Sequence, residues 1–349
     1  MSAMPSPSIR RRCLCLALAS AALAPGQLRF AHAQDAVRIR LATLAPRGSS
    51  YHRILLELGE RWKKAQEGGA SFTVFTDGTQ GGEADAVRRM RVGQLNAGLL
   101  SVVGLLEIDR AVSVLQQMPL VYRDWQELDY VRDRLAPTLE RRFRDKGFEV
   151  LFWGDGGWVR FFSSEPAATP QDFKRMRMFV WAGDQAQVEL MKRLGYQPVP
   201  IETADILPGL QTGLIDAVPA TPFFALAGQF NGPAPHMLDI KWAPIVGACV
   251  VTAKVWDAMS PVAREELKRA SAAAAIEVRA RARSEDLESI EAMKRRGLKV
   301  TTPTPQVEAQ WRAFADSVYP ALRGRIVPEE AFDEVMRLLA EHRAQRRPG

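Results

Sequence analysis

Hydrophobic and polar positions follow strand and helix periods in turn from residue 37 onward. The segment 37–45 (VRIRLATLA) alternates and then becomes apolar, which is typical of a strand that enters a core. Apolar residues of segment 50–65 recur at helical spacing, and a serine can cap the start of that helix. Further strands are predicted at 71–76 and 96–103, with a helix between them. This β-α-β-α-β order favours a mostly parallel sheet with helices on its faces.

A second series of alternating strands and helices follows. It begins with strand 148–153, which runs into residues 154–157 (GDGG), and we expect these four residues to break the strand and carry the chain to a second lobe. The apolar segment 243–253 (APIVGACVVTA) is predicted to return to the first lobe. Between these two segments, short strands are predicted at 176–181, 197–201 and 215–220, and helices separate them.

A long helix is predicted from Pro261 to Arg296, because no glycine and no further proline interrupts that segment. Ser260 is suited to cap its start, and Gly297 follows its end in the usual C-terminal place. At roughly 1.5 Å per residue the helix is about 54 Å long, which exceeds the width of one lobe. We therefore expect it to brace both lobes along one side.

These elements predict an α/β protein with two lobes of the venus-flytrap type, crossing strands and a long bracing helix. We expect lobe I over residues 34–155 and lobe II over 156–245. Residues 246–349 then supply the return strand, the long helix and C-terminal helices that pack mainly on lobe I. Ligands bind beyond the carboxyl ends of strands in such sheets. The cleft should thus be lined near Ala45, Val103, Trp153, Trp181 and Ala220.

Residues 1–33 have the pattern of a secretory signal peptide. Three arginines, Arg10–Arg12, precede the apolar run 13–24, and Ala31–Ala33 reads as a small-x-small cleavage site. The alternative is a membrane anchor, but the run is shorter than the roughly 20 residues that span a bilayer. We expect export to the periplasm with cleavage near Ala33, while the Sec and twin-arginine routes both stay open.

The charge of the chain changes once this segment is set aside. Four of the arginines behind the net charge of +7 lie within residues 1–33, where no acidic residue occurs, so the mature chain is near +3. No basic stripe with interleaved aromatic residues occurs, so nucleic acid is not an expected partner. Cys249 is the one cysteine that remains, within an apolar run, and we expect a buried core residue and not a nucleophile.

The residues of the mature chain give no support to catalysis. Its histidines, His52, His236 and His342, are not spaced with other ligands as a metal site requires. No nucleophile elbow, P-loop or dinucleotide fingerprint occurs. We expect no metal, no cofactor and no enzymatic activity, although a triad of distant residues stays open as the alternative.

Aromatic residues gather instead at the expected cleft positions. Phe179 and Trp181 alternate on one strand, so they share a face, and the alternative is that they fill a lobe core. Arg160 is the cation that we place in the site, because a guanidinium among aromatic neighbours needs an anionic or carbonyl partner. The alternative is a surface arginine. Asp155 and Asp184 could pair with Arg160 or hold a cation, and the alternative is that they cap turns and helices. The candidate binding residues are Arg160, Phe179, Trp181, Thr221, Trp158, Phe223, Ser101 and Tyr51.

Four stretches in order carry a family resemblance. The chain resembles the solute-binding proteins of tripartite ATP-independent periplasmic (TRAP) transporters, of the DctP type. The resemblance implies the two-lobed periplasmic-binding-protein fold and delivery of a small organic ligand to the permease subunits of an ion-driven membrane transporter. The stretches are 76–93 (TDGTQGGEADAVRRMRVG), 115–124 (LQQMPLVYRD), 169–180 (TPQDFKRMRMFV) and 210–216 (LQTGLID).

Two departures from the family pattern change the expected ligand. Phe179 stands where members typically carry an arginine that pairs with the ligand's carboxylate, and Thr221 replaces an asparagine. Arg160 matches a second arginine of many members. The chain in this respect resembles a subset that has a hydrophobic cleft and works with a periplasmic tetratricopeptide-repeat protein. We expect a largely apolar ligand, with one carboxylate or carbonyl near Arg160 as an option.

Two other functions stay open. One is a conventional carboxylate receptor that uses Arg160, and the other is a ligand-sensing flytrap module without transport. The sequence leaves undecided the identity of the ligand, the oligomeric state, and whether a cation takes part in binding.

Overall fold

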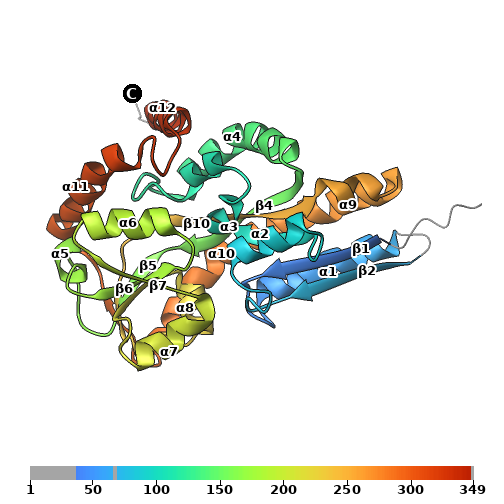
Figure 1. Ribbon diagram of the computed structural model, residues 1–349. Coiled ribbons are helices and arrows are strands. Elements are labelled where there is room, and N and C mark those ends of the chain that lie inside the picture. The colour runs from blue at the N-terminus through green and yellow to red at the C-terminus, as the bar shows by residue number, and fades with distance from the viewer. Residues whose placement is uncertain (1–36, 66–68, 347–349) are drawn as a thin grey trace, which may run out of the picture. The chain divides into compact units, whose positions relative to one another are not determined.

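The computed structural model describes residues 37–65 and 69–346 (Figure 1). The predicted signal peptide, residues 1–33, lies outside the described residues. Within 37–346 the chain forms two mixed sheets with helices packed around them, so the predicted α/β class is confirmed. No helix among the described residues is both long and apolar enough to cross a membrane.

The first sheet has the strand order β2-β1-β3-β10-β4. Strand β1 pairs in parallel with β2 and β3, as the β-α-β-α-β order predicts, whereas β10 runs antiparallel to both β3 and β4. The returning strand β10 therefore lies inside the sheet, between β3 and β4. The bounds are β1 (Val37–Thr43), β2 (Ala70–Phe75), β3 (Ala97–Ser101), β4 (Phe148–Trp158) and β10 (Pro244–Thr252).

The second sheet has the strand order β11-β9-β5-β8-β6-β7. Strand β6 runs parallel to β7 and β8, while β5 runs antiparallel to β8 and β9. The bounds are β5 (Arg160–Ser163), β6 (Arg177–Trp181), β7 (Gln197–Ile201), β8 (Ala217–Ala220), β9 (His236–Leu238) and β11 (Lys299–Thr301).

Helices cover the faces of both sheets (Figure 1). In chain order they are α1 (Ser50–Lys64), α2 (Glu83–Arg91), α3 (Val102–Leu105), η1 (Arg110–Leu115), α4 (Trp125–Asp145), α5 (Pro170–Phe173), α6 (Gln185–Arg193), η2 (Thr203–Asp205), α7 (Ile206–Gln211), α8 (Pro222–Ala227), α9 (Ala253–Ala258), α10 (Pro261–Lys294), α11 (Pro305–Leu322) and α12 (Glu329–Gln345).

The expectation that residues 154–157 break the strand is wrong. Strand β4 continues through them to Trp158, paired with β10 across irregular registers. Two of the glycines face α10: a Cβ on Gly154 would lie 2.8 Å from Cγ1 of Val278, and a Cβ on Gly157 would clash with Oδ1 of Asp286. The chain passes from the first sheet to the second at residue 159.

Helix α10 is the predicted long helix, and it contacts both halves of the protein. Ser260 caps it by accepting a hydrogen bond from the amide of Ala263 at 3.2 Å. The helix packs against α1 and β4 on the side of the first sheet and against α8 on the side of the second. Small residues such as Ala270 and Ala274 are buried along it, which allows close approach.

The C-terminal helices divide between the two sheets. Helix α12 packs on α4, whereas α11 places Trp311 in the core beside β5 and β6. The lobe boundaries drawn at residues 155 and 245 stay a prediction.

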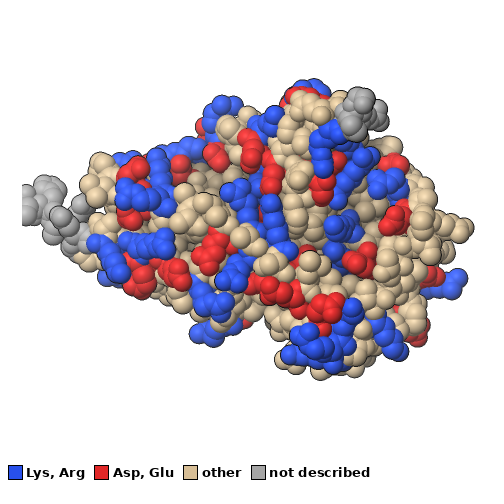
Figure 2. Space-filling view, turned by 180° about the vertical axis from the view of Figure 1, so that it is seen from behind, with Lys and Arg blue, Asp and Glu red and all other residues tan. Residues whose placement is uncertain are grey.

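The charged side chains lie mostly at the surface. On the face that Figure 2 shows, Lys and Arg are interspersed with Asp and Glu. Some ion pairs join exposed residues three positions apart on the same helix, such as Arg88 with Asp85 on α2. Pairs of this kind are exposed, and each contributes little to stability.

Candidate ligand-binding cavity

A cavity of about 330 Å³ lies between the two sheets and is lined by residues of both. The first sheet contributes residues that follow β1 and β3, and the second contributes the ends of β6 and β8. Of the five expected positions, Ala45, Val103, Trp181 and Ala220 line the cavity. Trp153 does not line it, because its side chain points elsewhere and donates from Nε1 to Glu140 Oε1 at 2.9 Å. The size is that of a small-molecule site.

The lining is largely apolar and aromatic. No lysine, arginine or histidine among the described residues contributes to it. Gln117 is one of the residues of the lining with an amide side chain. Its Oε1 is buried and has no hydrogen-bond partner in the described part of the chain, so this oxygen is free to accept a hydrogen bond from a ligand. Apart from the tryptophans, the polar side chains of the lining are Thr43, Tyr51, Glu83, Ser101, Gln116, Gln117, Asp155, Gln187, Tyr196 and Thr221.

The aromatic candidates on β6 and near it lie at the cavity. Phe179 and Trp181 meet edge to face, with ring centroids 5.0 Å apart, and both line the cavity. From the opposite side, the ring of Tyr51 lies 5.4 Å from that of Phe223. The hydroxyl of Tyr51 donates to the backbone oxygen of Asp155 at 3.1 Å.

Two further candidates cap short helices at the cavity wall. The hydroxyl oxygen of Ser101 accepts from the amide of Val103 at 3.2 Å, and that of Thr221 accepts from the amide of Phe224 at 3.3 Å. The structure thus brings six of the eight candidate residues to one cavity: Tyr51, Ser101, Phe179, Trp181, Thr221 and Phe223. Their roles in binding stay a prediction.

Arg160 and Trp158 are not brought to the cavity. The guanidinium of Arg160 pairs through Nε with Asp239 Oδ1 at 2.5 Å, and its Nη1 donates to the carbonyl of Trp158 at 3.2 Å. Side chains alternate along an extended chain, and Val159 and Phe161 line the cavity. Arg160 and Trp158 therefore face the other way, and the buried arginine meets its partner within the protein.

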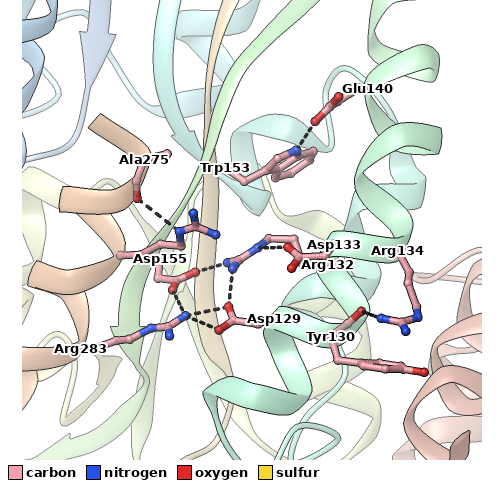
Figure 3. A network of polar contacts seen from close by, with 11 residues as sticks. Asp129, Tyr130, Arg132, Asp133, Arg134, Glu140, Trp153, Asp155, Ala275 and Arg283 are labelled. Atoms are coloured by element: carbon pink, nitrogen blue, oxygen red, sulfur yellow. Dashed lines mark hydrogen bonds and ion pairs between the residues drawn. The ribbon is translucent and has the colours of Figure 1, made fainter. Parts of the chain in front are cut away.

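Asp155 does not pair with Arg160 but with two other arginines (Figure 3). Its Oδ1 lies 2.5 Å from Nη1 of Arg132, and its Oδ2 lies 3.0 Å from Nη2 of Arg283. Asp129 bridges the same two guanidinium groups. The network joins α4, β4 and α10, and it leaves the backbone oxygen of Asp155 to orient Tyr51.

For Asp184 the capping alternative holds, because it caps α6 by accepting from the amide of Gln187 at 3.1 Å. Its Oδ2 also accepts from Gln117 Nε2 at 3.4 Å, so it joins a loop on the side of the first sheet to α6. Burial raises the pKa of this carboxyl.

Glu83 is a wall residue that the sequence reasoning did not select. Its carboxylate accepts hydrogen bonds from the amides of Ser101 and Gly104, at 2.7 and 3.0 Å, and from the hydroxyl of Ser101. Burial raises its pKa, against the effect of these hydrogen bonds. The one signal in the sequence was its place in the stretch 76–93, where it is the first residue of α2.

Asp286 lies at the crossing from β4 to β5. Its Oδ2 accepts from the backbone amide of Trp158 at 2.9 Å, while its Oδ1 has no hydrogen-bond partner among the described residues. Burial raises the pKa of Asp286 to about 6, and the amide of Trp158 and the charges of Arg160 and Lys241 oppose that rise. The carboxyl is thus partly protonated near neutral pH.

The described residues contain no group of three or more His, Cys, Asp and Glu side chains that could hold a metal ion. Cys249 is fully buried in a core cluster, and burial raises the pKa of its thiol to about 12. A thiol with so high a pKa is a poor nucleophile.

Comparison with curated proteins places this chain among periplasmic binding proteins. It is 23% identical over 214 residues to the C4-dicarboxylate-binding periplasmic protein DctP of Rhodobacter capsulatus, a match over 61% of this chain and 64% of that one. It is 22% identical over 298 residues to the 2,3-diketo-L-gulonate-binding periplasmic protein YiaO of Escherichia coli, over 80% of this chain and 84% of that one. The matched part spans less than two thirds of the Rhodobacter protein.

Solved structures share the fold. A TRAP periplasmic solute binding protein of Xanthobacter autotrophicus with bound β-D-galacturonate has a TM-score of 0.78 at 20% identity, covering 86% of this chain and 99% of that one. One of Shewanella oneidensis with bound succinate has a TM-score of 0.80 at 16% identity, covering 87% and 99%. The predicted two-lobed periplasmic-binding-protein fold is confirmed by these matches.

The family described as bacterial extracellular solute-binding protein, family 7 (DctP) matches residues 41–324. Its members are binding proteins, so the expectation that the chain is not an enzyme is confirmed. With most of its length matched, the chain belongs to the DctP family of bacterial extracellular solute-binding proteins.

Proposed function

We propose that this protein is the periplasmic receptor of a TRAP transporter and that it delivers a largely apolar organic ligand to the permease subunits. The observation that carries the proposal is the composition of the cavity: aromatic and aliphatic side chains dominate it, and none of the described lining residues is cationic. Phe179 stands in the wall, where an arginine would provide a bidentate carboxylate clamp.

The anionic groups of the wall argue against a ligand carboxylate in the cavity. Glu83 lines it and is held by donors of the protein itself. A buried carboxylate without a cationic partner is costly, and a second carboxylate beside it raises that cost. A hydrocarbon group, by contrast, gains about 0.8 kcal/mol for each methylene that leaves water.

A conventional carboxylate receptor is the second candidate. The relatives with bound galacturonate and succinate favour it, because their ligands are carboxylates. For this chain it requires Arg160 to leave Asp239 and turn toward the cavity, since the guanidinium is 4% exposed and already paired.

Three further parts of the proposal rest on the sequence. We propose export to the periplasm with cleavage near Ala33, lobes divided near residues 155 and 245, and a tetratricopeptide-repeat protein as an additional partner. A ligand-sensing role without transport is the alternative, and it predicts that no permease subunit binds the closed protein.

Mass spectrometry of the ligand that co-purifies with the protein tests the proposal. We expect a molecule with more apolar than polar surface. Calorimetry with succinate and with hexanol then compares the two candidates directly, and hexanol should bind more tightly. A small polar acid as native ligand, or tighter binding of succinate, would overturn the apolar assignment.

A further inference from the structure

The cavity does not end at the strand ends. Part of its lining comes from α6 and α11, and we call the space beside these residues the α11 compartment. Six side chains define this compartment, and none of them is charged: Leu194, Tyr196, Phe314, Val318, Leu322 and Ile326. The Tyr196 hydroxyl, the single polar side-chain atom of the six, donates to the carbonyl of Pro170 at 3.3 Å. The compartment therefore offers an apolar surface.

The loop that follows η1 closes the compartment on the side of the first sheet. Gln117 and Pro119 of this loop line the cavity. The loop is tied to α11, because the Tyr319 hydroxyl donates to the carbonyl of Pro119 at 2.7 Å. It is tied to the second sheet by Leu120, whose amide donates to the carbonyl of Trp242 at 2.7 Å.

Leu120 also shows that this wall is held in a strained form. Its φ of 55° lies in the left-handed region, which a leucine rarely adopts. Such strain persists only where surrounding contacts impose it, and it concentrates at functional sites. The hydrogen bond from the amide of Leu120 to Trp242 is one such contact.

Aromatic rings give the compartment a fixed cross-section. Phe314 stacks on Trp242 with centroids 6.1 Å apart and tilts against Tyr196 at 5.6 Å. Trp242 in turn packs edge to face on Trp311 at 5.4 Å. Rings packed on one another in this way leave an apolar surface without charged groups, which suits an unbranched hydrocarbon chain better than a sugar acid.

We propose that the α11 compartment is a tail subsite, and that the ligand is an elongated molecule with a straight hydrocarbon tail. The tail lies along Phe314, Val318 and Leu322, while the polar end stays in the cleft beside Phe179. This inference rests on the proposed function and deepens it, since it names the shape of the apolar ligand. Apolar spaces of this kind stay dry, so a hydrocarbon tail displaces little water.

The test uses the full mature protein and straight-chain primary alcohols from butanol to dodecanol, with affinity measured by calorimetry. We expect affinity to rise about fourfold with each added methylene and to level off once the compartment is full. Val318→Phe fills the compartment and should move that limit to shorter alcohols. Phe314→Ala enlarges it and should move the limit to longer ones. Ala313→Phe, at an exposed position of α11, should leave the limit unchanged.

A second measurement locates the tail directly. In crystals soaked with a terminally brominated decanol, anomalous scattering should place the bromine within the α11 compartment, among the side chains of Phe314, Val318 and Leu322. This result does not depend on whether either variant folds. A bromine in the cleft or at the surface would overturn the inference.

The outcomes separate this inference from the proposed function. If affinity rises with chain length but Val318→Phe and Phe314→Ala leave the limit where it is, the tail subsite is wrong and the apolar ligand stands. If no alcohol binds at any length, both are wrong.

Discussion

The carboxyl of Asp286 makes the stability of this protein depend on pH in a direction that can be measured. It lies on α10 at the crossing between the two sheets, where it faces the amide of Trp158 and the charges of Arg160, Asp239 and Lys241. Its Oδ1 has no partner among the described residues, which suits a protonated carboxyl. Asp286→Asn replaces it by a neutral group of the same shape.

The magnitude follows from the pKa. Burial raises the pKa of Asp286 from 3.8 to about 6 in the folded protein. A raised pKa means that the folded state holds the proton more tightly than the unfolded state. The contribution of this carboxyl to the free energy of unfolding is therefore fully present below pH 3.8 and is lost as the pH rises through 6. A tenfold change in proton affinity is worth about 1.4 kcal/mol, so the loss by pH 7 is about 3 kcal/mol.

The assay is urea denaturation of the wild-type protein and of Asp286→Asn from pH 4 to pH 7. Since asparagine does not titrate, the difference in unfolding free energy should grow by roughly 2 to 3 kcal/mol in favour of the variant over this range. Titrating groups that lie far from residue 286 are shared by the two proteins and cancel in the difference. Glu288→Gln, at an exposed position of the same helix, serves as the control and should show no such growth. A difference that stays constant with pH would refute the reasoning.

Three further predictions test the site and its supports. Phe179→Arg should create measurable succinate binding in calorimetry and weaken hexanol binding more than tenfold, and unchanged selectivity would contradict its place in the wall. Asp155→Asn leaves the buried guanidinium of Arg132 and the half-buried one of Arg283 short of an anion and should cost about 3–5 kcal/mol in chemical denaturation, whereas exposed Asp133→Asn should cost under about 1 kcal/mol. Gly157→Ala should lower stability by roughly 1–3 kcal/mol more than Gly183→Ala does. Both glycines have positive φ, but of the two only Gly157 has another residue where the added Cβ would lie. Equal losses of stability in the two variants would exclude that clash.

The local pattern of the chain was sufficient for most of the elements. Hydrophobic periodicity predicted the parallel strands β1 to β3, the returning strand β10 and the helix α10, because each of these depends on neighbours in sequence. The positions of Phe179, Trp181 and Thr221 at the cavity also followed, since strand ends meet at one edge of a sheet.

The residue at which the chain crosses from the first sheet to the second could not be predicted from the local pattern. The run 154–157 suggested a break, but the glycines accommodate the close approach of α10, a segment more than a hundred residues away. Because the crossing falls at residue 159, the alternation of side chains turns Arg160 and Trp158 away from the cavity. The expectation that these two side chains face the cavity is therefore wrong, while the roles of the other six candidates stay a prediction.

The sequence by itself determined the elements, the two-lobed class and the aromatic character of the site, since these depend on periodicity and on residue type. Only the tertiary structure decided which charges find partners inside the protein. Asp239 pairs with Arg160, and Arg132 and Arg283 enclose Asp155, and each pair joins residues at least twenty-three positions apart. Such pairs form because burying a lone charge is costly, and no pattern of neighbours along the chain indicates which distant group will be near.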